Sequence, residues 1–208
     1  MASDLLPLDA PGLQLASSGA APGSRLTIHS ASAEATRLLG EALGRLLGPG
    51  TLLRLQGDLG AGKTVFCQGL AWGLGVPRTA YVNSPSFTYV REHRSGRIPF
   101  FHVDLYRVSD PEELDLIGLR DYLDGRGVCA VEWPERAHGW LPEQGLAVRI
   151  EDCGPETGTA RRISLHGLDG STPAILATLD GWLVAAAPVA PIDAAPTDAA
   201  PSDAVPGD

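Results

Sequence analysis

A glycine-rich octapeptide at residues 57–64 reads GDLGAGKT and fits the pattern GxxxxGK[ST]. Phosphate oxygens need several converging donors, and a loop with little side-chain bulk lets successive backbone N–H groups point inward. In such a loop Lys63 places its ammonium between the β- and γ-phosphates, and the Thr64 hydroxyl is a ligand for Mg²⁺. The residues expected to form this phosphate-binding loop are Gly57, Asp58, Leu59, Gly60, Ala61, Gly62, Lys63, Thr64 and Val65.

Lys63 is the only lysine in the chain, and all the other side chains in the Lys+Arg total of 16 are arginines. The broad planar fork of arginine cannot replace a compact ammonium inside a tight loop. The single lysine therefore falls where arginine could not serve, which favours a functional loop over a purely structural one. It also rules out the NKxD element that guanine-specific proteins with this loop commonly carry, so adenine is the expected base.

The segments before the loop alternate between strand and helix patterns. A strand is expected at 51–56, directly before the loop, and another at 26–28. Between them, apolar residues recur at helical spacing over 35–46, and the sequence Gly-Pro-Gly at 48–50 ends that helix. The loop therefore has the context it requires, which is a strand before it and a helix after it.

Two further apolar runs each end in a carboxylate. Residues 98–103 precede Asp104 and residues 128–131 precede Glu132, as buried strands that lead to an active edge do. A phosphate-binding loop of this type needs a carboxylate on a neighbouring strand to position Mg²⁺ or its water ligands. We expect one of the two mainly to hold the metal and the other mainly to orient the attacking water. Spacing along the chain does not assign these roles.

The remaining elements complete an α/β pattern. Asp110 can cap a helix, with Pro111 at its first position and Glu113 reaching back to the cap. Strand patterns that alternate with helical ones predict a single P-loop NTPase-like domain with a central, largely parallel sheet flanked by helices. The later elements are expected as strands at 146–150 and 162–165 and as a closing helix at 175–183 that Pro188 ends.

The two ends of the chain differ in composition from its middle. Residues 1–24 are rich in Ala, Gly, Ser and Pro without lasting periodicity, and they are expected to form a poorly ordered leader. From Pro191 a five-residue unit repeats, with aspartate two positions after each proline, so 188–208 are expected to be a disordered, solubilising tail. The domain itself is expected over 25–187.

Composition narrows the class of protein. A chain of 208 residues with 44% hydrophobic and 20% charged residues suits one α/β domain that buries its own core. The net charge of −9 argues against a broad RNA-binding surface, so contact with RNA is expected to run through a partner. The scattered cysteines Cys67, Cys129 and Cys153 indicate neither disulfides nor a zinc site. We expect a cytoplasmic location and no membrane contact, because no basic residue precedes Arg25 and no apolar run is long enough to span a bilayer.

The chain resembles the TsaE family, which assists threonylcarbamoyladenosine modification of tRNA. The resemblance rests on GDLGAGKT at 57–64, SPSF at 84–87, HVDLYR at 102–107 and VEWPE at 131–135, and it covers about residues 26–166. It implies an ATPase with slow basal turnover that acts with TsaD and TsaB, the pair that transfers the threonylcarbamoyl group to adenosine 37 of tRNA. Contact with tRNA itself would be indirect.

The resemblance also implies roles for individual residues. Thr64 and Glu132 would bind Mg²⁺, and Asp104 would be the Walker B acid that supports hydrolysis. A switch-like loop near the γ-phosphate would consist of Ser84, Pro85, Ser86 and Phe87, and the hydroxyl of Ser86 stands where the family usually has threonine. Trp133 would pack beside the site. The base would lie near Ser30, Ser32 and Thr36, although helix capping explains those hydroxyls equally well.

Several residues and two other functions stay open. His102, Tyr106 and Arg107 suit either the site or an ordinary structural role. A small-molecule kinase is one alternative, with an arginine-bearing lid at 91–97, although that segment equally suits an exposed hairpin turn. The other alternative is a nucleotide-gated binding module in which ATP orders the 84–87 loop and hydrolysis is incidental.

Overall fold

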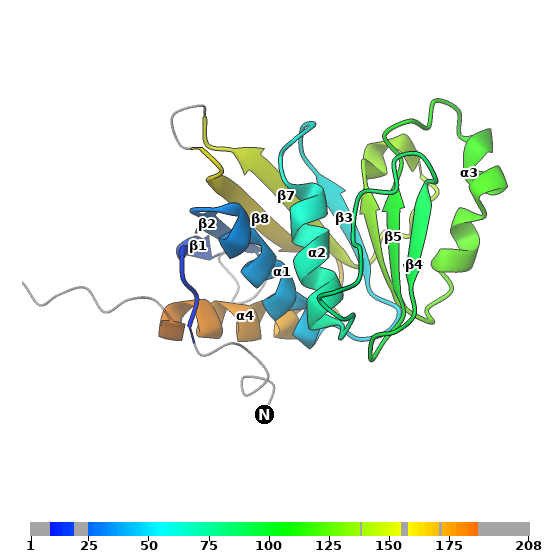
Figure 1. Ribbon diagram of the computed structural model, residues 1–208. Coiled ribbons are helices and arrows are strands. Elements are labelled where there is room, and N and C mark those ends of the chain that lie inside the picture. Colours follow the sequence, from blue (N-terminus) through cyan, green and yellow to red (C-terminus); the bar gives the residue numbers. More distant parts are fainter. Residues whose placement is uncertain (1–8, 19–24, 138, 155–157, 171, 187–208) are drawn as a thin grey trace, which may run out of the picture.

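A single mixed sheet organises the protein (Figure 1). The computed structural model describes residues 9–18, 25–137, 139–154, 158–170 and 172–186. The strands are β1 (Leu13–Ser18), β2 (Arg25–Ser30), β3 (Leu52–Gln56), β4 (Val90–His93), β5 (Phe100–Asp104), β6 (Val128–Glu132), β7 (Leu146–Asp152) and β8 (Arg161–Gly167). The α-helices are α1 (Ala33–Leu46), α2 (Lys63–Gly73), α3 (Glu112–Ile117) and α4 (Pro173–Ala186), and the 3-10 helices are η2 (Leu119–Tyr122) and η3 (Pro134–Ala137).

The eight-stranded sheet has the order β1-β2-β8-β7-β3-β6-β5-β4. Its centre is parallel, because β3 pairs in parallel with both β7 and β6, and β6 pairs in parallel with β5. The expected α/β fold is therefore confirmed, with a parallel core. The outer strands are antiparallel, since short connections join β4 to β5 and β7 to β8, and a short connection can reverse a strand but cannot make a parallel crossover.

The expected N-terminal leader needs a correction. Within the range 1–24, residues 13–18 form β1, which pairs with β2 from Leu13 opposite Ser30 to Ser18 opposite Leu26. Ala10 and Leu13 are buried in the main core. Short composition-biased segments show little periodicity, so β1 gave a weak signal, yet it extends the sheet by one strand. Residues 1–8 and 19–24, the tail at 188–208 and the predicted stop at Pro188 lie outside the described residues.

The helices cover the two faces of the sheet unequally. One face carries α1, α2 and α4, whose apolar residues share a core with Leu53, Leu55, Phe100 and Ala130 of the central strands (Figure 1). The other face is covered over β5 and β6 by α3, η2 and η3, through a second core that contains Leu114, Leu119 and Ala137. Both β5 and β6 are consequently buried at every position, as strands covered on two sides are.

Two of the expected helix starts can be compared with the structure. Ser32 accepts a hydrogen bond from Ala35 N at 3.1 Å and caps α1, which begins two residues before the predicted range. Glu113 accepts from Asp110 N at 3.0 Å, so the predicted reach of Glu113 back to Asp110 is confirmed, whereas the expected cap at Asp110 is not, because the N-cap position of α3 is Pro111 and has no side-chain cap. Pro111 lies directly before α3 rather than inside it. Among the described helices, none is both long and apolar enough to cross a membrane.

Helices α1 and α2 approach closely through glycines that the sequence patterns did not single out. A Cβ added at Gly69 would lie 2.0 Å from the carbonyl oxygen of Arg37, and one added at Gly40 would lie 2.4 Å from that of Phe66. Gly44 and Gly73 meet in the same way further along the pair. Backbone therefore touches backbone along this contact, which fixes the direction of α2 and so the direction of its N-terminus.

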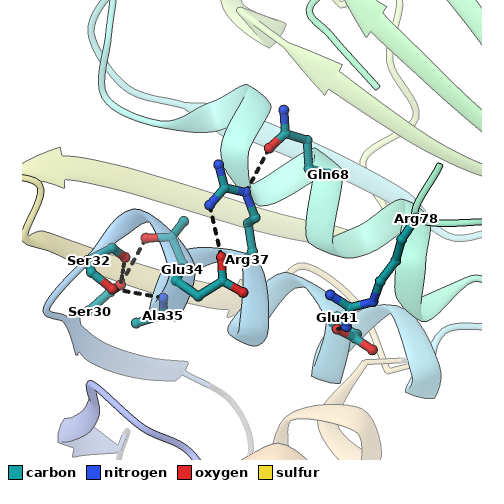
Figure 2. Close-up of polar contacts among 9 residues, drawn as sticks. Ser30, Ser32, Glu34, Ala35, Arg37, Glu41, Gln68 and Arg78 are labelled. Carbon is teal, nitrogen blue, oxygen red and sulfur yellow. Dashed lines mark hydrogen bonds and ion pairs between the residues drawn. The ribbon is translucent and has the colours of Figure 1, made fainter. Parts of the chain in front are cut away.

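Polar side chains continue the α1–α2 contact (Figure 2). Arg37 donates from Nε to Gln68 Oε1 at 2.9 Å, and Gln68 donates from Nε2 to the carbonyl of Val82 at 3.0 Å. Glu41 is nearly buried and pairs with Arg45 at 2.7 Å and with Arg78 at 2.6 Å. The chain that leads into residues 84–87 is thus tied to both helices.

Replacement of Gly69 by alanine is expected to destabilise the fold by at least about 2 kcal/mol, because the methyl group meets backbone that can relax only by moving a helix. Gly181 in α4 is a matched control, since no atom of the described residues lies within 4 Å of its Cβ position. Gly181→Ala is expected to stabilise the fold by about 0.5–1 kcal/mol through helix propensity. Urea denaturation measures both. Equal effects would contradict the close approach.

Candidate functional site

The glycine-rich loop joins β3 to the N-terminus of α2, as the sequence predicts. Gly57 has φ 149°, and a Cβ there would lie 2.3 Å from the carbonyl oxygen of Ile150. Gly62 has φ 105° and occupies the N-cap of α2 without any side-chain cap. Only glycine suits these two backbones, and the uncapped helix start leaves amide donors for an anion.

Lys63 lies nearly buried at the start of α2, with its ammonium turned into the loop. Its Nζ donates to the carbonyl of Gly57 at 2.7 Å and to that of Asp58 at 2.9 Å. The same atom lies 4.1 Å from the ring centroid of Trp133. Burial lowers the pKa of Lys63, and the opposing pull of Glu132 and Asp104 helps to keep its charge.

The two predicted carboxylates lie side by side. Asp104 ends β5 and Glu132 ends β6, and the two residues are direct partners in the parallel register. Each is only 3% exposed. Both therefore lie at one edge of the sheet, the edge at which β3 enters the loop. Two buried carboxylates next to each other repel, so a nearby cation stabilises them.

Glu132 and Asp104 have different partners. Glu132 Oε1 accepts from Thr64 Oγ1 at 3.0 Å and is 2.8 Å from Nε2 of the fully buried His102. Asp104 accepts from the hydroxyl of Ser84 through Oδ2 and from the amide of Tyr106 at 2.9 Å through Oδ1. Glu132 is thus joined to the first turn of α2, whereas Asp104 is joined to the 84–87 loop.

The 84–87 loop turns at the mouth of the site. The carbonyl of Pro85 accepts from the amides of Thr88, at 2.9 Å, and Tyr89, at 2.6 Å. Phe87 is 80% exposed, and the guanidinium carbon of Arg107 lies 4.4 Å from its ring centroid. The loop is therefore turned by its own backbone and anchored at Ser84, while its tip projects outward.

These residues enclose a cavity of about 420 Å³. Its lining contains most of the predicted site: Leu59, Gly60, Gly62, Lys63, Thr64, Val65, Ser84, Ser86, Asp104, Tyr106, Arg107, Glu132 and Trp133. Gly57 and Asp58 lie behind it and contribute the carbonyls that Lys63 contacts. Ala61 is buried behind the loop. The structure thus gathers these residues in one place, and their individual chemical roles stay predictions.

A second cavity, of about 720 Å³, lies next to the loop. It is lined by residues 9–14, His29, Ser30, Ala31, Cys153, Ala160, Arg161 and Ala186. Of the three hydroxyls predicted near the base, only Ser30 reaches it. Ser32 caps α1 (Figure 2). Thr36 is buried, and its hydroxyl lies 2.8 Å from that of Ser30. Helix capping therefore accounts for Ser32.

The sequence patterns missed several neighbours of the site. His102 stayed open, yet it contacts Glu132. Its position two residues before Asp104 puts both side chains on one face of β5, which strand alternation could have indicated. Cys67 lies on α2 with its Sγ within 4.8 Å of a ring nitrogen of His102 and of a carboxylate oxygen of Glu132, and burial raises the pKa of its thiol well above the usual value. Arg161, on the distant strand β8, contacts the loop without any local signal.

The arginine-bearing segment at 91–97 covers residues 91–93 of β4 and the turn that follows them toward β5. Arg97 donates to the carbonyls of Gly44, Arg45 and Leu47 at the C-terminal end of α1. The turn lies at the start of β5, whereas Asp104 lies at its end. The hairpin-turn interpretation thus accounts for Arg94 and Arg97, which lie at the far end of β5 from Asp104, whereas Arg91 lies in β4 opposite His102 and donates to the carbonyl of Tyr81.

Comparison with known proteins agrees with this geometry. The sequence model of the family described as "Threonylcarbamoyl adenosine biosynthesis protein TsaE" matches residues 30–163. The chain belongs to the TsaE family. That match begins at the end of β2 and therefore leaves β1 outside it. The family name refers to the biosynthesis of threonylcarbamoyl adenosine, a modification that the relatives' names place in tRNA.

Individual TsaE proteins are similar over most of their length. The tRNA threonylcarbamoyladenosine biosynthesis protein TsaE of Bacillus subtilis is 41% identical over 132 residues, which are 64% of this chain and 81% of the relative. The TsaE protein of Streptomyces coelicolor is 40% identical over 140 residues, 64% of this chain and 90% of the relative. The crystal structure of Bacillus subtilis YdiB superposes with a TM-score of 0.63 at 32% identity, covering 76% of this chain and 95% of that one.

Proposed function

We propose that the protein binds ATP with Mg²⁺ in the 420 Å³ cavity and hydrolyses it slowly, in support of threonylcarbamoyl modification of adenosine 37 in tRNA. The observation that carries this proposal is the convergence on one cavity of the glycine-rich loop, Lys63, Thr64, Asp104 and Glu132. A cradle of amides with one ammonium suits phosphates, and two buried carboxylates beside it suit a divalent cation.

The residues at the edge of the cavity fit Mg²⁺. Thr64 Oγ1 and Glu132 Oε1 are 3.0 Å apart. In near-ideal octahedral coordination with bonds of about 2.1 Å, neighbouring ligand oxygens are also about 3 Å apart. Thr64 and Glu132 would therefore hold the ion directly or through its water ligands, with His102 orienting Glu132. A bound Mg²⁺ supplies charge neutralisation at the β- and γ-phosphates.

Asp104 is the residue best placed to orient water. Ser84 and the amide of Tyr106 hold its carboxylate, and unlike Glu132 it has no contact with Thr64 among the hydrogen bonds of the described residues. A carboxylate fixed at the cavity wall can orient a water molecule toward the terminal phosphate and accept a proton from that water. Lys63 would meanwhile bind the β- and γ-phosphate oxygens.

The nucleoside half of ATP would extend toward the 720 Å³ cavity beside the loop. Its apolar walls, with a few polar groups such as Ser30 and His29, suit a purine ring. Adenine is favoured over guanine because Lys63 is the only lysine, which leaves none for an NKxD element. Residues 9–14 form one wall, so the added strand β1 would contribute to nucleotide binding in this chain.

The partners are proposed from the family. We propose that the protein acts in the cytoplasm with the TsaD and TsaB proteins and reaches tRNA only through them, without any membrane contact. The net charge of −9 supports indirect contact with RNA. The exposed ring of Phe87 beside the cavity is a place where a protein partner could bind and respond to the nucleotide in the cavity.

ATP turnover is expected to be slow for the protein alone and to rise at least about tenfold when the cognate TsaD and TsaB proteins are added, because a partner that orders the 84–87 loop would fix Ser84 and hence Asp104. Steady-state release of phosphate measures the rate. An unchanged rate with the active pair would reject the coupling, whereas no turnover under any condition would reject the ATPase itself.

A further inference from the structure

Arg161 of β8 connects the β7–β8 hairpin to the back of the glycine-rich loop. Its Nε donates to the carbonyl of Ala61 at 2.8 Å, and its Nη1 donates to the carbonyl of Ala160 at 2.8 Å. Nη1 also lies 3.3 Å from Oδ2 of Asp152, and the side chain is only 12% exposed. One guanidinium thus spans two segments that are 100 residues apart in sequence.

The contact with Ala61 fixes the orientation of one peptide group of the loop. A peptide group is planar and trans, so its carbonyl and its N–H point in opposite directions. When Arg161 holds the Ala61 carbonyl on the outside, the N–H of Gly62 is directed to the other side. Gly62 is the uncapped N-cap of α2 and lines the 420 Å³ cavity. Its N–H is therefore aimed where phosphate oxygens would lie.

We propose that Arg161 is a positioning residue for phosphate binding, which holds the Ala61–Gly62 peptide with its N–H toward the nucleotide. This inference rests on the proposed function, because it assumes a phosphate in the cavity. Arg161 does not line that cavity and instead lines the 720 Å³ cavity beside the loop. It therefore acts through the backbone and not by touching the phosphates.

Arginine suits this role better than lysine. Its planar fork donates in several fixed directions at once, so it can hold Ala61 while it holds Ala160 and Asp152. A lysine would supply the charge with a single flexible nitrogen. The neighbouring Arg162 is exposed and alternates to the opposite face of β8, so it carries the same charge and makes no hydrogen bond to the loop among the described residues.

The test uses the full chain with Mg²⁺ and two probes, inorganic tripolyphosphate, which has no base, and adenosine, which has no phosphate. Calorimetry well below the melting temperature measures their affinities for Arg161→Ala, Arg161→Lys and the control Arg162→Ala. Both Arg161 variants are expected to bind tripolyphosphate about 10- to 100-fold more weakly, since a charge-assisted hydrogen bond that orders a donor is lost. Adenosine affinity is expected to fall much less than tripolyphosphate affinity, because Arg161 is only one of the residues that line the neighbouring cavity, and Arg162→Ala is expected to match the wild type.

Each other outcome has a clear meaning. Unchanged tripolyphosphate affinity in Arg161→Ala overturns the positioning role, and if adenosine affinity falls instead, Arg161 serves the neighbouring cavity. Full affinity in Arg161→Lys overturns the requirement for the planar guanidinium, because a lysine could then hold the Ala61 carbonyl equally well. Failure of the wild-type protein to bind either tripolyphosphate or ATP overturns the proposed function itself. A thermal melt of each variant shows that a folded protein was compared.

Discussion

Replacement of Lys63 by alanine is expected to weaken binding of Mg-ATP at least about 100-fold and to reduce turnover below detection. The ammonium donates to the carbonyls of Gly57 and Asp58 inside the loop, and it is the only lysine in the chain. Charge-assisted hydrogen bonds contribute about 1.5–3 kcal/mol each, so loss of two contacts to phosphate oxygens accounts for a change of this size. Calorimetry with a non-hydrolysable ATP analogue measures the affinity.

Lys63→Arg separates the shape of the cation from its charge. The guanidinium of arginine keeps the charge but is broader than an ammonium. The space around Lys63 Nζ is limited by the carbonyls of Gly57 and Asp58 and by the ring of Trp133, so the guanidinium does not fit there. We expect Lys63→Arg to bind ATP nearly as weakly as Lys63→Ala. Arg149→Ala is the control for loss of one positive charge, since its side chain is 64% exposed on β7. Full binding by Lys63→Ala would refute the phosphate cradle and with it the proposed function.

Replacement of Asp104 by asparagine is expected to lower ATP turnover about 10²- to 10⁴-fold while ATP affinity changes less than about threefold. The amide is nearly isosteric and keeps contacts to Ser84 and to the amide of Tyr106, but it cannot accept a proton from water. Phosphate release and calorimetry on one preparation give the two quantities. An equal loss of affinity and turnover would instead assign Asp104 to metal binding.

Glu132→Gln provides the contrast. Glu132 contacts Thr64, so we expect this variant to need a higher Mg²⁺ concentration for half-maximal binding of ATP. The same pair of variants tests the binding-module alternative. If Asp104→Asn supports tRNA modification in cells although it binds ATP without hydrolysing it, turnover is incidental and gating by the nucleotide is the function. Loss of modification would favour hydrolysis as the required step.

Much of the candidate site could be predicted because phosphate and metal binding require particular residue types, and several of these residues are close together in the sequence. The loop needs glycine where φ is positive and one compact cation, and these requirements appear as GDLGAGKT. Asp104 and Glu132 could be found because each ends a buried apolar run, and the ends of neighbouring parallel strands meet at one edge. Sequence spacing left the roles of the two carboxylates open, and their different partners in the structure now suggest an assignment.

Other features depend on contacts between distant parts of the chain and leave no local pattern. Arg161 looks like any strand arginine until β8 is placed beside the loop. The glycines of α1 and α2 lower helix propensity, and only the close approach of the two helices explains Gly40 and Gly69. Strand β1 was missed because it is stabilised by pairing with β2 and has little strand pattern of its own. The antiparallel edges of the sheet were missed because the sequence does not show which strands pair with each other.

The complete burial of β5 and β6 constrains how proteins with this architecture can diversify. His102, Asp104 and Glu132 share their strands with core residues such as Phe100 and Val131, so a substitution that retunes the chemistry also disturbs the interior. Evolution of a new specificity should therefore proceed through the surface segments around the mouth. Phe87, at the exposed tip of the 84–87 loop, is such a position, whereas Ser84 and Arg161 are held by their contacts with Asp104 and Ala61.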